Sequence, residues 1–176
     1  MMKHARTLRL VLMLSAVVLI APPAFAGPPI LYHPFDIGNA RSLPWSTSPV
    51  WYQGDSKYDI RNVVADTEAL LTPPMPVIVR METIRRAAVY ASLDTAVASQ
   101  LLNRLRARTT QPGAERDALA WFDAAYLTGI FKQMLLIASE PPLRERAEHL
   151  RQLTGLDDSM RLVQKAIALR RPIAAP

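Results

Sequence analysis

Few residues of this chain have the types and spacing that catalysis or metal binding requires. The stretch "HPFDIG" places His33 three residues before Asp36, so the two could share a metal ion or form a base and the carboxylate that orients it. Pro34 separates them in a segment without regular periodicity, so we favour a loop histidine that bonds to nearby backbone. His149 lies among charged residues of a helical stretch, and we expect it at the surface.

Motifs of the common enzyme classes are missing from the sequence. It contains no G-x-S-x-G, no H-E-x-x-H and no glycine-rich phosphate loop. Asp55 and Asp59 are the closest pair of carboxylates for glycoside chemistry, but they look like turn and helix-entry residues. The chain has no cysteine, which excludes disulfides, thiol catalysis and zinc–thiolate sites. We therefore expect no cofactor and no metal, although a hydrolase with a convergent site stays open.

Asp123 is the most distinctive charged residue. It lies in "ALAWFDAAYLTGIFKQMLLIA", where apolar residues occur on all sides of the predicted helix, so the helix should be buried on most sides. Lys132 and other polar residues in the same stretch disfavour the alternative, a membrane span. A buried carboxylate without a partner is costly, so we predict a structural ion pair in which Arg85 or Arg86 reaches Asp123.

Helical periodicity begins at about residue 59 and continues to Pro172. It predicts six helices, broken by proline and glycine, over about residues 60–71, 76–91, 95–109, 114–139, 140–155 and 157–171. Asp94 should cap the third helix. In the second helix an apolar stripe should face the core while the charged residues 80, 82, 85 and 86 face elsewhere, and in the last helix Met160, Val163 and Ile167 should point inward.

The predicted fold is all-α, with about six helices in antiparallel hairpins, as a bundle or a short α-solenoid. Tyr90 and Tyr126 are spaced close to the tetratricopeptide period, yet the other positions of that repeat do not align. The character is thus tetratricopeptide-like at most, and no family is assigned.

An aromatic and proline-rich arm, residues 27–58, precedes the helical domain, residues 59–176. It holds six of the twelve aromatic residues of the chain. Proline cannot sustain helix, so we expect an extended, irregular arm whose aromatic side chains dock elsewhere. We favour a strap along the helices, either permanent or displaceable. The alternative is an exposed binding surface formed by His33, Phe35, Asp36, Trp45, Trp51 and Tyr52.

Residues 1–26 have the plan of a secretory signal peptide. Basic residues come first, an apolar run of residues 10–20 follows, and Ala24 and Ala26 suit a cleavage site. Removal of the three cations before residue 10 lowers the formal net charge from +6 to +3. The remaining charges are interspersed, which is typical of solvated helix faces rather than of nucleic-acid binding.

These observations predict an exported protein, periplasmic or secreted after cleavage near Ala26, that acts as a non-catalytic helical interaction module. Its partner would be another exported protein or a peptide. Two alternatives stay open: a small exported enzyme or ligand-binding protein with a site between the arm and the helices, and a structural subunit of an envelope assembly. We expect neither nucleic-acid binding nor membrane association after cleavage.

Overall fold

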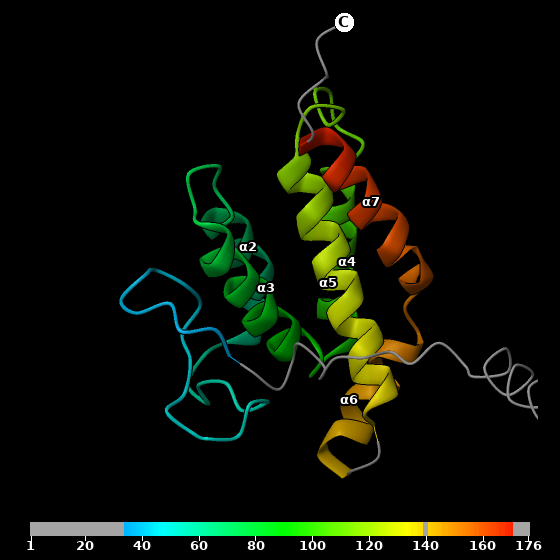
Figure 1. Ribbon diagram of the computed structural model, residues 1–176. Helices are drawn as coiled ribbons and strands as arrows, with labels where there is room; N and C mark the ends of the chain where they lie inside the picture. Colours follow the sequence, from blue (N-terminus) through cyan, green and yellow to red (C-terminus); the bar gives the residue numbers. More distant parts are fainter. Residues whose placement is uncertain (1–33, 139–140, 171–176) are drawn as a thin grey trace, which may run out of the picture.

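The computed structural model describes residues 34–138 and 141–170, and every regular element in this part of the chain is helical (Figure 1). The α-helices are α2 (Val63–Leu70), α3 (Val77–Ala91), α4 (Thr95–Ala107), α5 (Ala118–Leu136), α6 (Pro141–Arg151) and α7 (Ser159–Arg170). Two 3₁₀ helices, η2 (Ile60–Asn62) and η3 (Leu156–Asp158), precede α2 and α7. The prediction of an all-α fold with about six helices is confirmed for this part. The predicted signal peptide and His33 lie outside the described residues.

Side-chain caps fix the starts of two helices. Asp94 accepts a hydrogen bond from the Val97 N–H at 2.9 Å, so the predicted cap of α4 is confirmed. Asp117 accepts bonds from the N–H groups of Leu119 and Ala120, both at 3.0 Å. Helix α5 therefore begins at residue 118 rather than near residue 114, because the cap follows the turn that contains Gly113.

Helix α5 is the central element of the fold. It contacts α3, α4, α6 and α7, and it is buried on most of its sides (Figure 1). This explains why its apolar residues show no single stripe. None of the helices in the described ranges is both long enough and apolar enough to cross a bilayer.

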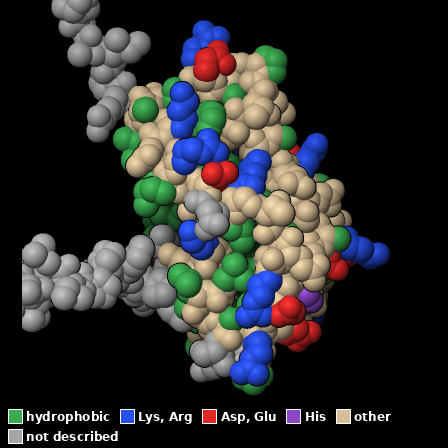
Figure 2. All heavy atoms as spheres, turned by 90° about the vertical axis from the view of Figure 1, so that its right-hand side faces the viewer, with side chains coloured by type: hydrophobic (Ala, Val, Ile, Leu, Met, Phe, Trp, Pro, Cys, Tyr) green, Lys and Arg blue, Asp and Glu red, His purple; other side chains and the backbone are tan. Residues whose placement is uncertain are grey.

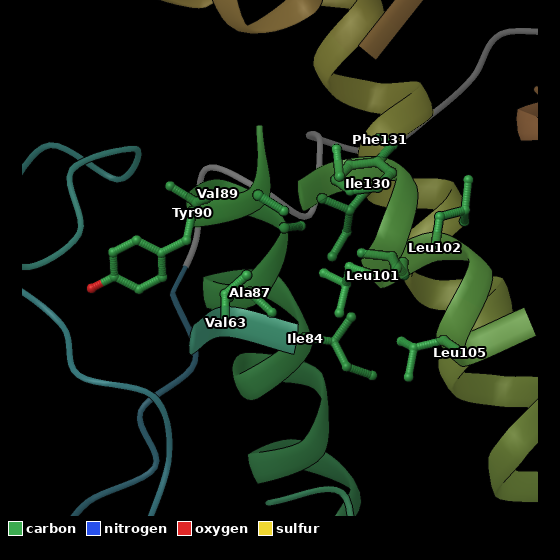
Figure 3. Close-up of a cluster of buried hydrophobic side chains, with 14 of the residues drawn as sticks. Val63, Ile84, Ala87, Val89, Tyr90, Leu101, Leu102, Leu105, Ile130 and Phe131 are labelled. Carbon is green, nitrogen blue, oxygen red and sulfur yellow. The ribbon is translucent and has the colours of Figure 1, made fainter. Parts of the chain in front are cut away.

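The main core lies where α3, α4 and α5 meet. Ile84, Leu101, Leu105 and Phe131 have no exposed surface, and their side chains point into the space between these helices (Figure 3). Tyr90, at the end of α3, points away from this aliphatic cluster and toward the arm (Figure 3). Helix α3 thus serves two interfaces, one with the helical body and one with the arm.

Residues 34–59 contain no helix or strand. They run beside α3, on the side of the molecule opposite α7 (Figure 1). Leu43 is their most deeply buried side chain, with 1% of its surface exposed. This segment is called the arm below.

Candidate functional site

Most of the charged side chains of α3 are buried. Arg80, Glu82 and Arg85 have no exposed surface, although the stripe in the sequence predicts that they face away from the core. The expectation fails because these residues are covered by two elements: the arm lies over Glu82 and Arg85, and α5 packs against Arg80. Two ionic clusters result, and they are the most unusual feature of the molecule.

The first cluster is centred on Glu82. Arg85 binds both of its carboxylate oxygens, with Nε 2.7 Å from Oε2 and Nη2 2.8 Å from Oε1. Arg86 Nε donates to Oε1 at 2.8 Å, and the Phe35 N–H of the arm donates to Oε2 at 3.1 Å. A bidentate arginine is the strongest geometry for such a pair.

The remaining donors of this cluster bind the arm. Arg85 donates to the Trp51 carbonyl at 3.1 Å, and Arg86 donates to the Leu43 carbonyl at 2.8 Å. The Arg85 guanidinium also lies 4.6 Å from the centroid of the Trp45 ring, a cation–π contact. The cluster therefore attaches the arm to α3 through backbone groups of the arm and through the ring of Trp45.

Opposing effects act on the ionisation of Glu82. Burial disfavours the charged form, but the guanidinium groups of Arg85 and Arg86 and the Phe35 N–H hold the pKa of Glu82 below its ordinary value. The carboxylate stays ionised at neutral pH and has all of its partners in place. Such a group is suited to hold structure, and it is not poised to exchange a proton with a substrate.

The second cluster is centred on Asp123 of α5, and the predicted partners of this residue were wrong. Asp123 is buried, but its Oδ2 accepts bonds from Arg80 at 2.6 Å and from Arg108 at 2.9 Å. Arg85 and Arg86 are committed to Glu82 instead. The sequence showed that a partner was needed but could not show which turn of α3 faces α5. The second partner, Arg108, lies in the loop after α4 and was not among the predicted residues.

Burial raises the pKa of the Asp123 carboxyl, and the two guanidinium groups oppose that shift. Arg80 also donates to the Thr72 carbonyl at 2.5 Å, which ties the α2–α3 loop to the cluster. Two arginines share one carboxylate, so the second cluster carries a net charge of about +1 in a largely buried setting.

The aromatic residues of the predicted binding surface face the helical body. Phe35, Trp45, Trp51 and Tyr52 are half-buried and pack against the main core, whereas Asp36 is exposed and accepts a bond from the Gly38 N–H. The Trp45 ring meets Tyr90 edge to face, with ring centroids 5.6 Å apart. Trp51 and Tyr52 meet edge to face at 5.3 Å. These rings support the arm rather than form a flat platform in solvent.

A polar hollow of about 600 Å³ lies between the arm and the end of α3. Several of its polar groups already bind each other. The Tyr90 hydroxyl donates to the Pro44 carbonyl at 2.7 Å and accepts from the Asp55 N–H at 2.8 Å. Ser46 donates to the Gln53 carbonyl at 2.8 Å. These bonds hold the arm in shape, so the hollow offers few free polar groups for a ligand.

A different hollow is apolar and open. It is a groove of about 380 Å³ between the start of α3, the start of α5 and the end of α7. Its lining consists of Val77, Ala118, Leu119, Phe122, Ala166, Ile167 and Arg170. Val77 of α3 is 42% exposed and Ile167 of α7 is 50% exposed, so two large aliphatic side chains are exposed at the same hollow. We call this the α3–α5–α7 groove.

The exposure of α7 corrects a sequence-based expectation. Met160 and Ile167 were expected to point inward, but Met160 is 64% exposed and Ile167 lies on the groove. Leu162 and Ala166 are the buried residues of α7. The apolar face of α7 spans about half of the helix circumference, and packing on α5 covers only part of it. The uncovered part forms one wall of the groove.

No group of acidic or histidine residues in the described ranges could hold a metal ion. His149 is half-buried, and its Nδ1 lies 3.0 Å from the Ser92 carbonyl, so it was wrong to expect it at the surface. The residues that matter most to the two clusters and were missed are Arg80, Glu82 and Arg108. One pattern could have revealed Glu82, since it lies within four residues of three arginines.

Comparison with protein-family models, with curated proteins and with solved structures gave no match. The inference of function therefore rests on the geometry of this chain.

Proposed function

We propose that this protein is an exported, non-catalytic interaction module that binds an apolar helical segment of another exported protein in the α3–α5–α7 groove. The observation that carries the proposal is the exposure of aliphatic side chains on both walls of the groove, Val77 on α3 and Ile167 on α7. Exposed apolar surface that lines a hollow is typical of a binding site in a water-soluble fold.

The form of the apolar surface favours a helix as the occupant. Met160, Val163 and Ile167 follow i, i+3, i+7 spacing along α7, so an apolar strip continues from the groove for two turns, about 10.5 Å. Antiparallel or parallel helices pack through strips of this kind. Arg170 lies at the rim, where it would meet the polar edge of a bound segment.

Export is part of the proposal, on the basis of the composition of residues 1–26. The charge pattern also suits this setting. On the side of the molecule that carries α7, Lys and Arg side chains are spread among Asp and Glu side chains, with hydrophobic side chains between them (Figure 2). This surface has no single basic block of the kind that binds nucleic acid.

The test is affinity capture from the envelope fraction of the producing cells, with mass spectrometry as the readout. The bait is used as wild type, as Ile167→Asp, and as Gln164→Asp, which places the same charge on an exposed position of the same helix. A protein captured by wild type and by Gln164→Asp but lost with Ile167→Asp supports the proposal, provided that it binds again when purified. Equal capture by all three baits contradicts it.

A further inference from the structure

A second hollow adjoins the α3–α5–α7 groove. It encloses about 300 Å³, and its lining consists of Leu71, Pro73, Arg80, Arg108, Gly113, Arg116, Asp117 and Leu119. Leu119 lines both hollows, so they are neighbours on the surface. We call the second one the arginine hollow.

Cations outnumber anions around the arginine hollow. Three arginines and one carboxylate, Asp117, line it, and Asp123, the buried partner of Arg80 and Arg108, uses one of its two oxygens for these bonds. Asp117 accepts from two backbone N–H groups at the start of α5. Asp123 accepts from Arg80 and Arg108 through a single oxygen.

Two of the arginines retain donors for a ligand. The side chain of Arg108 is 22% exposed, and only its Nη1 is used by Asp123. The side chain of Arg116 is 86% exposed and lies 3.5 Å from Glu115, which is itself 65% exposed. An exposed pair of this length contributes little, so Glu115 does not hold Arg116 away from an anion.

We infer that the segment bound in the groove carries a carboxylate beside its apolar anchor, and that this carboxylate binds Arg116 and Arg108 in the arginine hollow. This inference rests on the proposed function and specifies the chemistry of the partner. The inference rests on charge complementarity between the partner and this surface. More arginines than carboxylates line the arginine hollow, and Leu119 separates it from the α3–α5–α7 groove, which is almost entirely apolar.

The geometry favours an acidic side chain of a peptide over the head group of a lipid. The apolar strip along α7 from Ile167 to Met160 extends beyond the groove and follows helical spacing, which suits a row of side chains. In a partner helix, an Asp or Glu three or four residues from an aliphatic anchor lies on the same face.

The probe is a phage-displayed library of random 16-residue peptides, selected on the purified protein. Each selected peptide is then tested against the Ile167→Asp variant. A peptide that binds wild type but not this variant is counted as a groove-binding peptide. The dissociation constant of one such peptide, and of its analogue with each Asp or Glu replaced by the amide, is then measured by fluorescence anisotropy. The variants are Arg116→Gln and, as a control on the exposed side of α7, Arg161→Gln, whose side chain is 64% exposed.

We expect groove-binding peptides to contain Asp or Glu near aliphatic or aromatic residues. The amide analogue should bind wild type about tenfold more weakly, and Arg116→Gln should weaken binding of the acidic peptide by a smaller factor, because Arg108 still binds the carboxylate. The two changes together should cost less than the sum of their separate costs, because both remove the contact between Arg116 and the carboxylate. Arg161→Gln should bind the acidic peptide as wild type does.

Three results would overturn the inference. Groove-binding peptides without acidic residues, or an amide analogue of equal affinity, would show that no carboxylate is recognised, while the groove itself would stand as a binding site. An equal loss in Arg161→Gln would show general attraction to a basic surface. If no selected peptide depends on Ile167, both the inference and the proposed function fail.

Discussion

Removal of Arg80 from the buried cluster should destabilise the protein strongly, whereas removal of an exposed arginine with an equally short ion pair should not. Arg80 lies 2.6 Å from Asp123 with both side chains fully buried. Arg61 lies 2.6 Å from Asp59 with side chains that are 84% and 40% exposed. The two bonds have the same length, so Arg80→Gln and Arg61→Gln compare a buried ion pair with an exposed one.

The magnitude follows from what each substitution leaves behind. A buried charge that loses its only partner costs about 3–5 kcal/mol. Arg108 still lies 2.9 Å from the same oxygen of Asp123, so the loss for Arg80→Gln belongs at the lower end, about 3 kcal/mol. The bond from Arg80 to the Thr72 carbonyl is lost as well. In a domain of this size, about 3 kcal/mol lowers Tm by roughly 6–12 °C.

The assay is urea unfolding followed by circular dichroism at 222 nm, with thermal melts in parallel. Arg80→Gln should lower the urea midpoint with an unchanged slope, and Arg61→Gln should leave the midpoint where it is. The double variant Arg80→Gln/Asp123→Asn should cost less than the sum of its two single changes. An Arg80→Gln protein that unfolds at the wild-type midpoint would refute the account of this cluster.

Two further predictions concern the arm and the central helix. The pKa of Glu82 is held below its ordinary value of 4.5, so the stability that its charge contributes is present above about pH 4.5 and is lost as the pH falls through the folded-state pKa. The difference in urea midpoint between wild type and Glu82→Gln should therefore shrink from about pH 6 to about pH 3, and a constant difference would contradict this. A methyl group at Gly54 would lie 2.5 Å from Tyr90 Cζ, so Gly54→Ala should cost about 1–3 kcal/mol in chemical unfolding. Gly129→Ala, in the interior of α5, adds a methyl group that meets no atom within 4 Å apart from its chain neighbours and the nearby backbone of its own helix, so it should instead stabilise by about 0.5–1 kcal/mol; equal effects at both glycines would count against the tight arm–α3 contact.

The helices themselves could be predicted from the sequence. Apolar spacing and breaks at proline and glycine locate six helices, and Asp94 marks the start of α4 because its side chain satisfies a local N–H group. The start of α5 was placed about four residues too early, since the turn before Asp117 contains residues that a helix would tolerate. These features depend on neighbouring residues along the chain, which is why a sequence pattern can reveal them.

Contacts between distant residues could not be predicted in the same way. The sequence showed that Asp123 needs a cationic partner, but Arg80 and Arg86 lie on different turns of α3, and only the packing of α3 on α5 selects Arg80. Glu82 was expected to face away from the core, and its burial could not be predicted because the arm that covers it has no periodicity from which its path could be inferred. For α7, the pattern showed a wide apolar face but not which half of it packs on α5.

The way in which α7 packs on α5 accounts for the candidate site. A groove exists because α7 packs through Leu162 and Ala166 and leaves Ile167 opposite Val77. The exposed half of the apolar face of α7 is therefore what turns a helical domain into a binding module in this proposal.

The central claim is tested most directly by site-specific photocrosslinking in the producing cells. A photoreactive phenylalanine analogue is placed at position 167, on the groove, and for comparison at Gln164, on the exposed side of the same helix. The account predicts one discrete crosslinked protein from position 167 and none of that mass from position 164. The same adducts from both positions, or none from position 167 while the protein is present at its normal level, would contradict it.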